Sequence, residues 1–456
     1  MGTDHPCVVV VGAGIAGLTA AFRLQQAGCR VRILESQPPE RLGGRMATVG
    51  RDGFPVDLGA PLLARRYRRM LNLLAEAGAS HLVTPAADEL AVLHGGRTLR
   101  GRTGSLPRLL SGGLLSTVPL RHRLRLLHDV RNLHRSIGSS ATSAITPAQH
   151  ESTAAYARRR RFPDTVMSHI LDPLNATMTL SDPDRTSAAT PLLTLAFFAA
   201  GNGLFTAPTG TGFVPHALAQ RLAVTHHARV TSVEEAKDHV TVVWTSPGDG
   251  DHEEQADAVV LAVPPDQLPA LWPQLRQDQH EYFASARYAH LLQVTFCLNR
   301  PTSETAVVLY AGRHDLPQVA ALILQHNLSP DRVGHGRGMV TAYLRDTTSQ
   351  DWWHDDDRLI ARRVTAAVRR AGLLPELDSA VIATHVDRIW PSVLIRPPQD
   401  PGLLARLEAT THQQAHRVHL AGADLFGHST TIGSLTSGEQ AAHRVLARLG
   451  AGAATA

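Results

Sequence analysis

Residues 7–45, CVVVVGAGIAGLTAAFRLQQAGCRVRILESQPPERLGGR, determine how the rest of the sequence is interpreted. The run 8–11 consists of valines, which is typical of a buried parallel strand. The pattern G-x-G-x-x-G follows at once: Gly12 suits a tight turn, Gly14 the close approach of a pyrophosphate, and Gly17 helix–sheet packing. The sequence therefore predicts a strand that leads into a nucleotide-binding turn.

A helix and a second strand complete this unit. Residues 18–27 have helical spacing and end before Gly28, and the amide groups at such a helix N-terminus bind phosphate. The second strand, 30–34, ends in Glu35, which lies 23 positions after Gly12, close to the ~20 expected of a carboxylate that binds the adenosine ribose. Strand, helix, second strand and acid together favour a bound dinucleotide over glycines that merely pack a helix on a sheet.

Two further segments indicate which dinucleotide is bound. RLGGR at 41–45 and GFPVDLGA at 53–60 resemble segments of the flavin-containing amine oxidase and protoporphyrinogen oxidase superfamily, which binds FAD. The resemblance implies that the backbone and guanidinium of 43–45 lie against the phosphates and ribityl chain, and that 59–62 runs beside the isoalloxazine. The FAD-binding residues that it implies are Gly12, Ala13, Gly14, Ile15, Ala16, Gly17, Glu35, Ser36, Gly43, Gly44, Arg45, Gly59, Ala60, Pro61, Leu62, Val230, Gly422, Asp424, Thr431 and Ile432.

The composition is that of a globular enzyme. At 456 residues the chain exceeds a single hydrophobic core, so two domains are expected, and 43% hydrophobic residues exclude a disordered chain. The net charge of +5 is mild, and all but one of the 45 basic residues are arginine, so we expect no nucleic-acid partner. Arginines gather at 65–69, 121–125 and 158–161; solvated helix faces explain such clusters, and binding of an anionic group is the alternative.

The cysteines and the apolar segments indicate the cellular compartment of the protein. Cys7, Cys29 and Cys297 have neither paired spacing nor a C-x-x-C motif, which argues against disulfides and a metal site and fits a reducing compartment. Residues 1–6 are too few and too polar for a signal peptide, and the apolar run 191–200 is about half the ~20 residues that cross a bilayer. We therefore expect a cytoplasmic protein without a transmembrane segment.

The order of elements predicts an α/β fold. We expect a Rossmann-like FAD-binding domain built from discontinuous segments, a substrate domain with a mixed or mainly antiparallel sheet, and an inserted helical lobe. The expected bounds are 1–85, 206–268 and 412–456 for the FAD-binding domain, 86–205 and 269–411 for the substrate domain, and about 104–205 for the helical lobe.

Periodicity places further elements along the chain. It predicts helices at 65–77, 106–110, 120–137, 152–161, 164–175, 187–200, 214–223, 355–371 and 433–449. It predicts strands at 81–84, 90–93, 228–233, 240–244, 256–263, 290–298, 305–310, 319–325, 339–344 and 381–386, with 240–244 and 256–263 forming a hairpin. A final strand from Val418 leads to a turn at Gly422, and Thr430 or Thr431 is expected to cap the last helix, whose N-terminus would stabilise negative charge on reduced flavin.

The resemblance implies hydride removal to flavin N5, with the protein supplying position and electrostatics. It leaves the substrate open, since the fold hosts amine and amino-acid oxidases, porphyrinogen oxidases, carotenoid desaturases and non-catalytic escort proteins. Alignment on Pro301 puts Gln293 where many amine oxidases carry a lysine linked through water to N5. Before the last FAD segment, Trp390 alone matches an aromatic side of their substrate cage. Both differences from the amine oxidase pattern favour the protoporphyrinogen oxidase-like branch of the superfamily.

We therefore expect an FAD-dependent oxidase, dehydrogenase or desaturase of specialised biosynthesis that acts on a C–C or C–N bond of a bulky, largely apolar small molecule. FAD is expected to be non-covalent, and molecular oxygen is a candidate electron acceptor. An amine or amino-acid oxidase is the alternative enzyme, and an escort-type protein the non-enzyme alternative. Gln293 and His428 are the candidate catalytic residues: a neutral Gln293 suffices for direct hydride transfer, whereas His428 would act if an amine had to be deprotonated.

Overall fold

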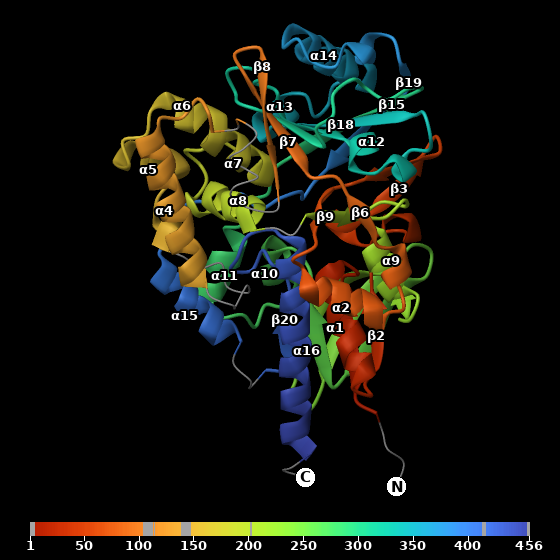
Figure 1. The fold of residues 1–456 in the computed structure, drawn as a ribbon. Coiled ribbons are helices and arrows are strands. Elements are labelled where there is room, and N and C mark those ends of the chain that lie inside the picture. Colours follow the sequence, from red (N-terminus) through yellow and green to blue (C-terminus); the bar gives the residue numbers. More distant parts are fainter. Residues whose placement is uncertain are drawn as a thin grey trace.

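The computed structural model describes residues 5–103, 113, 115–137, 147–200, 203–412 and 416–453. In Figure 1, the N-terminal helix and the C-terminal helix lie side by side at one end, a large sheet lies at the other end, and a group of helices forms a lobe on one side. The α/β fold class expected from the sequence is confirmed by two sheets of different kinds.

A five-stranded parallel sheet carries the glycine-rich turn. Its order is β10-β2-β1-β14-β20, with β10 Val224–Thr225, β2 Arg30–Leu34, β1 Cys7–Val11, β14 Ala258–Leu261 and β20 Val418–Leu420. Helix α1, Ile15–Gln26, follows β1 and begins three residues earlier than predicted because Gly14 is its N-cap. The closing helix α16, Thr431–Ala453, packs against α1 so tightly that a Cβ at Gly438 would lie 2.2 Å from the carbonyl oxygen of Ala16.

An antiparallel three-stranded sheet packs on this one and corrects one prediction. Its strands are β11 Arg229–Glu235, β12 Val240–Ser246 and β13 Gly250–Ala256. The predicted hairpin of 240–244 with 256–263 is wrong, because β12 pairs with the polar segment β13. The apolar β14, which lies within the predicted strand 256–263, belongs to the parallel sheet. Polar alternation in β13 suits an edge strand, whereas four consecutive buried residues suit a central parallel strand.

The second large sheet has seven strands in the order β19-β15-β18-β17-β16-β7-β8. Their bounds are β19 Val381–Ile389, β15 Leu291–Leu298, β18 Gly338–Leu344, β17 Val319–Leu324, β16 Val308–Ala311, β7 Glu89–His94 and β8 Arg97–Arg102. Every neighbouring pair is antiparallel except β16 with β7, so the expectation of a mainly antiparallel sheet is confirmed. Helix α14, Asp357–Arg370, covers one face of it (Figure 1).

The helical lobe lies between β8 and the return to the parallel sheet. Its described helices are α4 Leu120–Ile137, α5 Thr153–Arg159, α6 Asp164–Val166, α7 Asp172–Thr179 and α8 Ala189–Ala200, with a π-helical turn at Met167–Leu171. The helix predicted at 106–110 lies outside the described residues. Other short helices, which had no clear periodicity, are α10 Leu268–Leu271, α11 Gln277–Ala284, α12 Gln325–Leu328, α13 Asp346–Asp351 and α15 Pro401–Thr411.

Two small sheets join the large ones. One is the hairpin β3 Thr48–Arg51 with β4 Phe54–Asp57, and the other has the order β5 Leu63–Ala64, β9 Leu204–Thr206, β6 Thr84–Ala86. The strand predicted at 81–84 is wrong, since a 3₁₀ turn, Ser80–Leu82, precedes β6. Helices α2 Arg68–Glu76 and α9 Phe213–Ala219 flank this region. The domain boundaries stay a prediction.

A buried ion pair fixes the junction between these sheets. Arg332 donates to the Asp57 carboxylate at 2.6 Å and to the Thr206 hydroxyl at 2.7 Å, and both charged side chains are fully buried. Asp57 also accepts from the Thr48 hydroxyl at 2.6 Å and from the Thr211 amide at 2.9 Å. The ion pair therefore ties β4, β9 and the 3₁₀ turn Pro330–Arg332 together.

The described helices include none with the length and apolar character needed to span a bilayer.

Candidate functional site

The turn between β1 and α1 forms an open cradle at a helix N-terminus. Gly12 has φ +100° and a Cβ there would lie 2.7 Å from the carbonyl oxygen of Ala262, so no other residue fits without strain. At Gly14, by contrast, an added Cβ would have no neighbour within 4 Å in the described chain, and no side chain caps the helix. The first amide groups of α1, from Ile15 onward, are thus free for an anion such as a pyrophosphate.

Glu35 stands at the edge of this cradle and is held in place by backbone donors. Its carboxylate accepts from the Ala13 amide at 2.6 Å and from the Gln37 amide at 2.8 Å, and the residue is 8% exposed. Each carboxylate oxygen can accept further hydrogen bonds, so a ribose hydroxyl can be bound as well. Ser36 beside it is exposed, and the Ala228 amide donates to the Glu35 carbonyl at 2.8 Å, which brings β11 with its buried Val230 to the end of β2.

The Gly43-Gly44-Arg45 turn lies directly beside the cradle. Gly43 pairs with Gly14 as an isolated bridge, and both glycines of the turn have positive φ, +100° and +57°. A Cβ at Gly43 would lie 2.5 Å from the Pro215 ring, and one at Gly59 would lie 2.3 Å from the Arg45 carbonyl oxygen. The segment Gly59, Ala60, Pro61 and Leu62 therefore runs along this turn, and all four residues are half-buried.

Arg45 and Asp424, from opposite ends of the sequence, form an ion pair at 2.6 Å. Asp424 is buried and also accepts from the hydroxyls of Ser429 at 2.6 Å and Tyr288 at 2.8 Å. Burial disfavours the charged carboxylate, but Arg45 and the two hydroxyls outweigh it and hold the pKa of Asp424 below its ordinary value. The side chain of Arg45 is itself 37% exposed although its partner Asp424 is buried, so the guanidinium remains accessible to a ligand.

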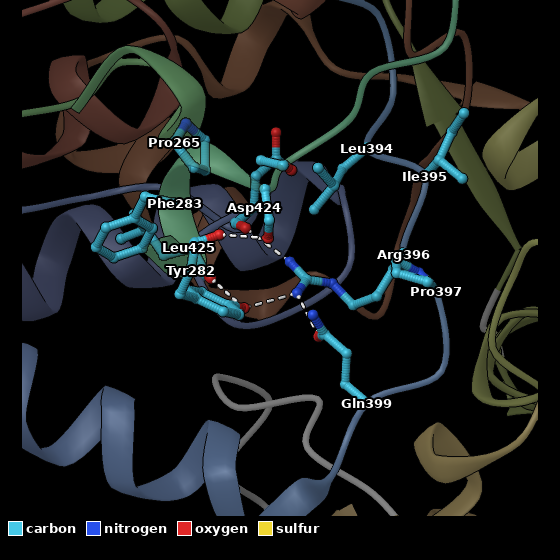
Figure 2. A pocket seen from close by; sticks show the side chains of 12 residues that line it. Pro265, Tyr282, Phe283, Leu394, Ile395, Arg396, Pro397, Gln399, Asp424 and Leu425 are labelled. Atoms are coloured by element: carbon cyan, nitrogen blue, oxygen red, sulfur yellow. Dashed lines mark hydrogen bonds between the residues drawn. The ribbon is translucent and has the colours of Figure 1, made fainter. Parts of the chain in front are cut away.

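A network behind Asp424 fixes its backbone. Figure 2 shows the guanidinium of Arg396 donating to the Asp424 carbonyl oxygen at 2.7 Å, to the Tyr282 hydroxyl at 2.8 Å and to Gln399 at 3.2 Å. The cavity drawn there has a volume of about 30 Å³, which is room for ordered water and far too small for a substrate. Neither Tyr288 nor Tyr282 belongs to a sequence motif, so they could not be found from the sequence.

The N-terminus of α16 closes the site from the other side. Thr430 caps it, since its hydroxyl accepts from the Gly433 amide at 3.1 Å, and Thr431 and Ile432 follow as half-buried residues of the first turn. Gly422 donates its amide to the Ser437 hydroxyl at 2.9 Å, which fixes the turn after β20 against this helix. The positive end of a second helix dipole therefore faces the same region as Arg45 and Asp424.

These observations fit FAD. An uncapped helix N-terminus with an open glycine fits the pyrophosphate, Glu35 fits the ribose, and Arg45 offers a partly exposed guanidinium in the turn beside the cradle. The structure thus brings together the predicted residues from 12–17, 35–36, 43–45 and 59–62 with those from 422–432.

The two catalytic candidates have very different surroundings. Gln293 is fully buried in β15 and donates to the Asp57 carbonyl oxygen at 2.8 Å, while its own oxygen has no partner in the described chain. His428 lies 3.5 Å from the Thr190 hydroxyl, and burial, aided by Arg396, lowers its pKa to about 3. His428 is therefore neutral at any working pH, and Gln293 acts as a structural link between β15 and β4.

Trp390 does not form a closed aromatic wall. Its side chain is 57% exposed and stacks on His290 at a centroid distance of 6.2 Å.

Comparisons with known proteins agree with this geometry. Residues 15–446 match the family model described as flavin containing amine oxidoreductase. The chain is similar to a coproporphyrinogen III oxidase of Mycobacterium bovis, with 49% identity over 72 residues, which is 16% of this chain and 16% of that relative. The matched stretch thus spans about a sixth of that relative's length.

Solved structures are similar over nearly the whole chain. A putrescine oxidase variant superposes with a TM-score of 0.76 at 21% identity, covering 97% of this chain and 99% of that one. A putative protoporphyrinogen oxidase from Exiguobacterium sp. 255-15 superposes with a TM-score of 0.72 at 16% identity, covering 98% of this chain and 100% of that one. At these identities the likeness establishes the fold.

Proposed function

Because the chain belongs to the flavin-containing amine oxidoreductase family and is an FAD-dependent oxidoreductase, we propose that it removes a hydride from a C–C or C–N bond of a bulky, largely apolar small molecule. When bound, FAD supplies the hydride acceptor. The protein binds and orients the cofactor through the cradle, Glu35 and Arg45. A cytoplasmic location, molecular oxygen as the electron acceptor and a place in specialised biosynthesis belong to the same proposal.

One observation supports this proposal most: neither Gln293 nor His428 can act as a base near neutral pH. Gln293 is neutral, and a histidine whose pKa is about 3 is too weakly basic to deprotonate an amine efficiently near pH 7. Direct hydride transfer needs position and exclusion of water rather than a base.

An aromatic series between the lobe and both sheets supports the apolar substrate. Tyr67, Phe197, Phe198 and Tyr310 contact one another in turn, with centroid distances of 5.8, 5.3 and 6.2 Å. Tyr67 belongs to the same hydrophobic core cluster as Leu435 of α16, against which Ile432 also packs, so this apolar cluster reaches the candidate cofactor site. Aromatic side chains of this size suit the binding of a large apolar surface.

The rate of flavin reduction by substrate is expected to be nearly independent of pH between about 6 and 9, once ionisation of the substrate itself is allowed for. The reason is that His428, with a pKa of about 3, does not titrate in this window and Gln293 never does. An anaerobic screen for bleaching of the flavin absorbance identifies a substrate, and stopped-flow reduction then gives the profile. A steep profile that disappears in His428→Ala would support the amine oxidase alternative instead.

Replacement of Glu35 tests the ribose contact. Glu35→Ala is expected to weaken FAD binding about tenfold to a hundredfold, because hydrogen bonds to a charged acceptor contribute roughly 1.5 to 3 kcal/mol. Glu35→Gln keeps one acceptor and should lose less. Glu40→Ala is the matched control, since Glu40 is an exposed acid in the next turn. Fluorescence titration of the apoprotein with FAD measures the constants, and equal affinity in wild type and Glu35→Ala would remove Glu35 from the site.

A further inference from the structure

A basic hollow lies on the outer side of the helical lobe, away from the cofactor site. It has a volume of about 480 Å³ and is lined by Arg121, His122, Arg125, Arg161, Phe162 and Pro163. Helix α4 supplies the first three of these residues and the segment that follows α5 supplies the other three, and Figure 1 shows both helices on the outer edge of the lobe. Two of the arginine clusters found in the sequence therefore meet in one place.

The arginines that line the hollow form no ion pair with a carboxylate of the described chain. Nearby, Arg160 is bound to Asp129 at 2.7 Å and Arg159 to Glu151 at 3.0 Å. Arg121, Arg125 and Arg161, by contrast, are exposed and have no carboxylate partner in the described chain. The closest acid in sequence, Asp164, is itself exposed and does not line the hollow. The hollow is therefore suited to an anionic ligand.

His122 adds a buried polar side chain to the same hollow. It lines the hollow but is 5% exposed, and its Nε2 accepts from the Arg121 guanidinium at 3.1 Å. The neutral ring then carries its proton on Nδ1, which has no partner in the described chain. A phosphate oxygen in the hollow would supply an acceptor for the charged and polar donors gathered there.

Exposed leucines adjoin the basic residues. Leu120 is 67% and Leu124 is 59% exposed, and they are one turn apart on α4 beside Arg121 and Arg125. Large apolar side chains at this level of exposure are rare in the described chain, where the others are Ile382, Trp390 and Leu403. Leucines flanked by unpaired arginines are the pattern of a helix that lies in a membrane interface.

We propose that the N-terminal half of α4, together with Arg161, is a peripheral docking site for a membrane that contains anionic phospholipids. The arginines bind the phosphate groups, and Leu120 and Leu124 enter the boundary between headgroups and acyl chains. Docking would place the enzyme where apolar small molecules concentrate. It does not depend on the proposed reaction, because binding can be measured without any substrate.

Vesicle flotation with the FAD-loaded protein tests the proposal. We expect binding to phosphatidylcholine vesicles that contain 30% phosphatidylglycerol, weak binding to pure phosphatidylcholine, and loss of binding as salt rises. Combined Arg121→Gln, Arg125→Gln and Arg161→Gln should weaken binding on the order of a hundredfold, from about fivefold per arginine. Leu120→Ser with Leu124→Ser should weaken it at least tenfold at unchanged charge.

A matched control removes the same charge elsewhere. Arg358, Arg362 and Arg370 are exposed on α14, at another end of the molecule in Figure 1, and their triple glutamine variant should bind vesicles as wild type does. Flavin content and melting temperature confirm that each variant is folded. Equal loss in both triple variants, or equal binding to neutral and anionic vesicles, would overturn the proposal. So would binding of inorganic phosphate in the hollow by a protein that binds no vesicles, because a soluble ligand would then be its occupant.

Discussion

Arg332→Met is expected to destabilise the protein by about 3–5 kcal/mol, the largest effect of any single substitution considered for this chain. The variant leaves the Asp57 carboxylate buried without its cation, although the Thr48 hydroxyl and the Thr211 amide still donate to it. Urea unfolding followed by intrinsic fluorescence measures the loss. Flavin retention should fall in parallel, because Asp57 lies two residues before Gly59 in the segment along the cofactor site.

Two further variants test whether the loss of stability comes from the unpaired buried charge. Arg332→Met combined with Asp57→Asn should be more stable than Arg332→Met alone, since the unpaired charge has been removed. Arg276→Met breaks an exposed pair with Asp278, whose side chains are 57% and 47% exposed, and should cost at most about 1 kcal/mol. Equal destabilisation by Arg332→Met and Arg276→Met would show that the buried pair has no special role.

Acid is expected to unfold the protein at an unusually high pH. Burial lowers the pKa of His412, His419 and His428 to about 3, with Arg444 adding to the effect at the first two and Arg396 at the third. The unfolded state takes up these protons near pH 6.5 while the folded state does not. Stability is thus fully present above about pH 6.5 and falls as the pH drops toward 3, by roughly 1.4 kcal/mol per pH unit for each histidine.

Melting temperatures measured from pH 8 to pH 5 test this linkage. We expect a flat profile above pH 7 and a steep decline below pH 6. His419→Asn, which removes one titrating group while keeping a polar side chain, should reduce the slope by about a third. A melting temperature that stays constant between pH 7 and pH 5 would mean that these histidines are accessible to protons in the folded protein.

Local patterns were sufficient to predict the cofactor-binding unit because its residues are adjacent in the chain. The G-x-G-x-x-G turn, the β2 strand and Glu35 form within the first 35 residues and depend on local geometry. The periodicity of α4 was also enough to place it over Leu120–Ile137, since an amphipathic helix carries its own signal.

Contacts between distant segments could not be predicted. The sequence predicts that the apolar run 256–263 pairs with 240–244, whereas β12 pairs with β13 and β14 lies in the parallel sheet, because the choice of partner strand depends on packing that short-range alternation does not encode. The Asp57–Arg332 pair and the hydroxyl of Tyr288 on Asp424 likewise join residues far apart in sequence. No motif marks Tyr288 or Arg332, so their positions became apparent only once the chain was folded.

The environment of His428 illustrates the same limit for the chemistry. From the sequence, His428 was a candidate base in a loop, and its environment decides against that role by lowering its pKa to about 3. Arg396, which adds to this shift and also donates to the Asp424 carbonyl oxygen, lies in the segment where the family resemblance implies an aromatic cage.

The cradle formed by α1, the Gly43–Arg45 turn and the N-terminus of α16 is expected to hold non-covalent FAD. Acid precipitation of the purified protein, followed by chromatography of the supernatant, tests it most directly. We predict a yellow protein that releases one FAD per chain and leaves a colourless pellet. A yellow pellet would contradict the non-covalent attachment, and release of FMN or of no flavin would contradict the dinucleotide site itself.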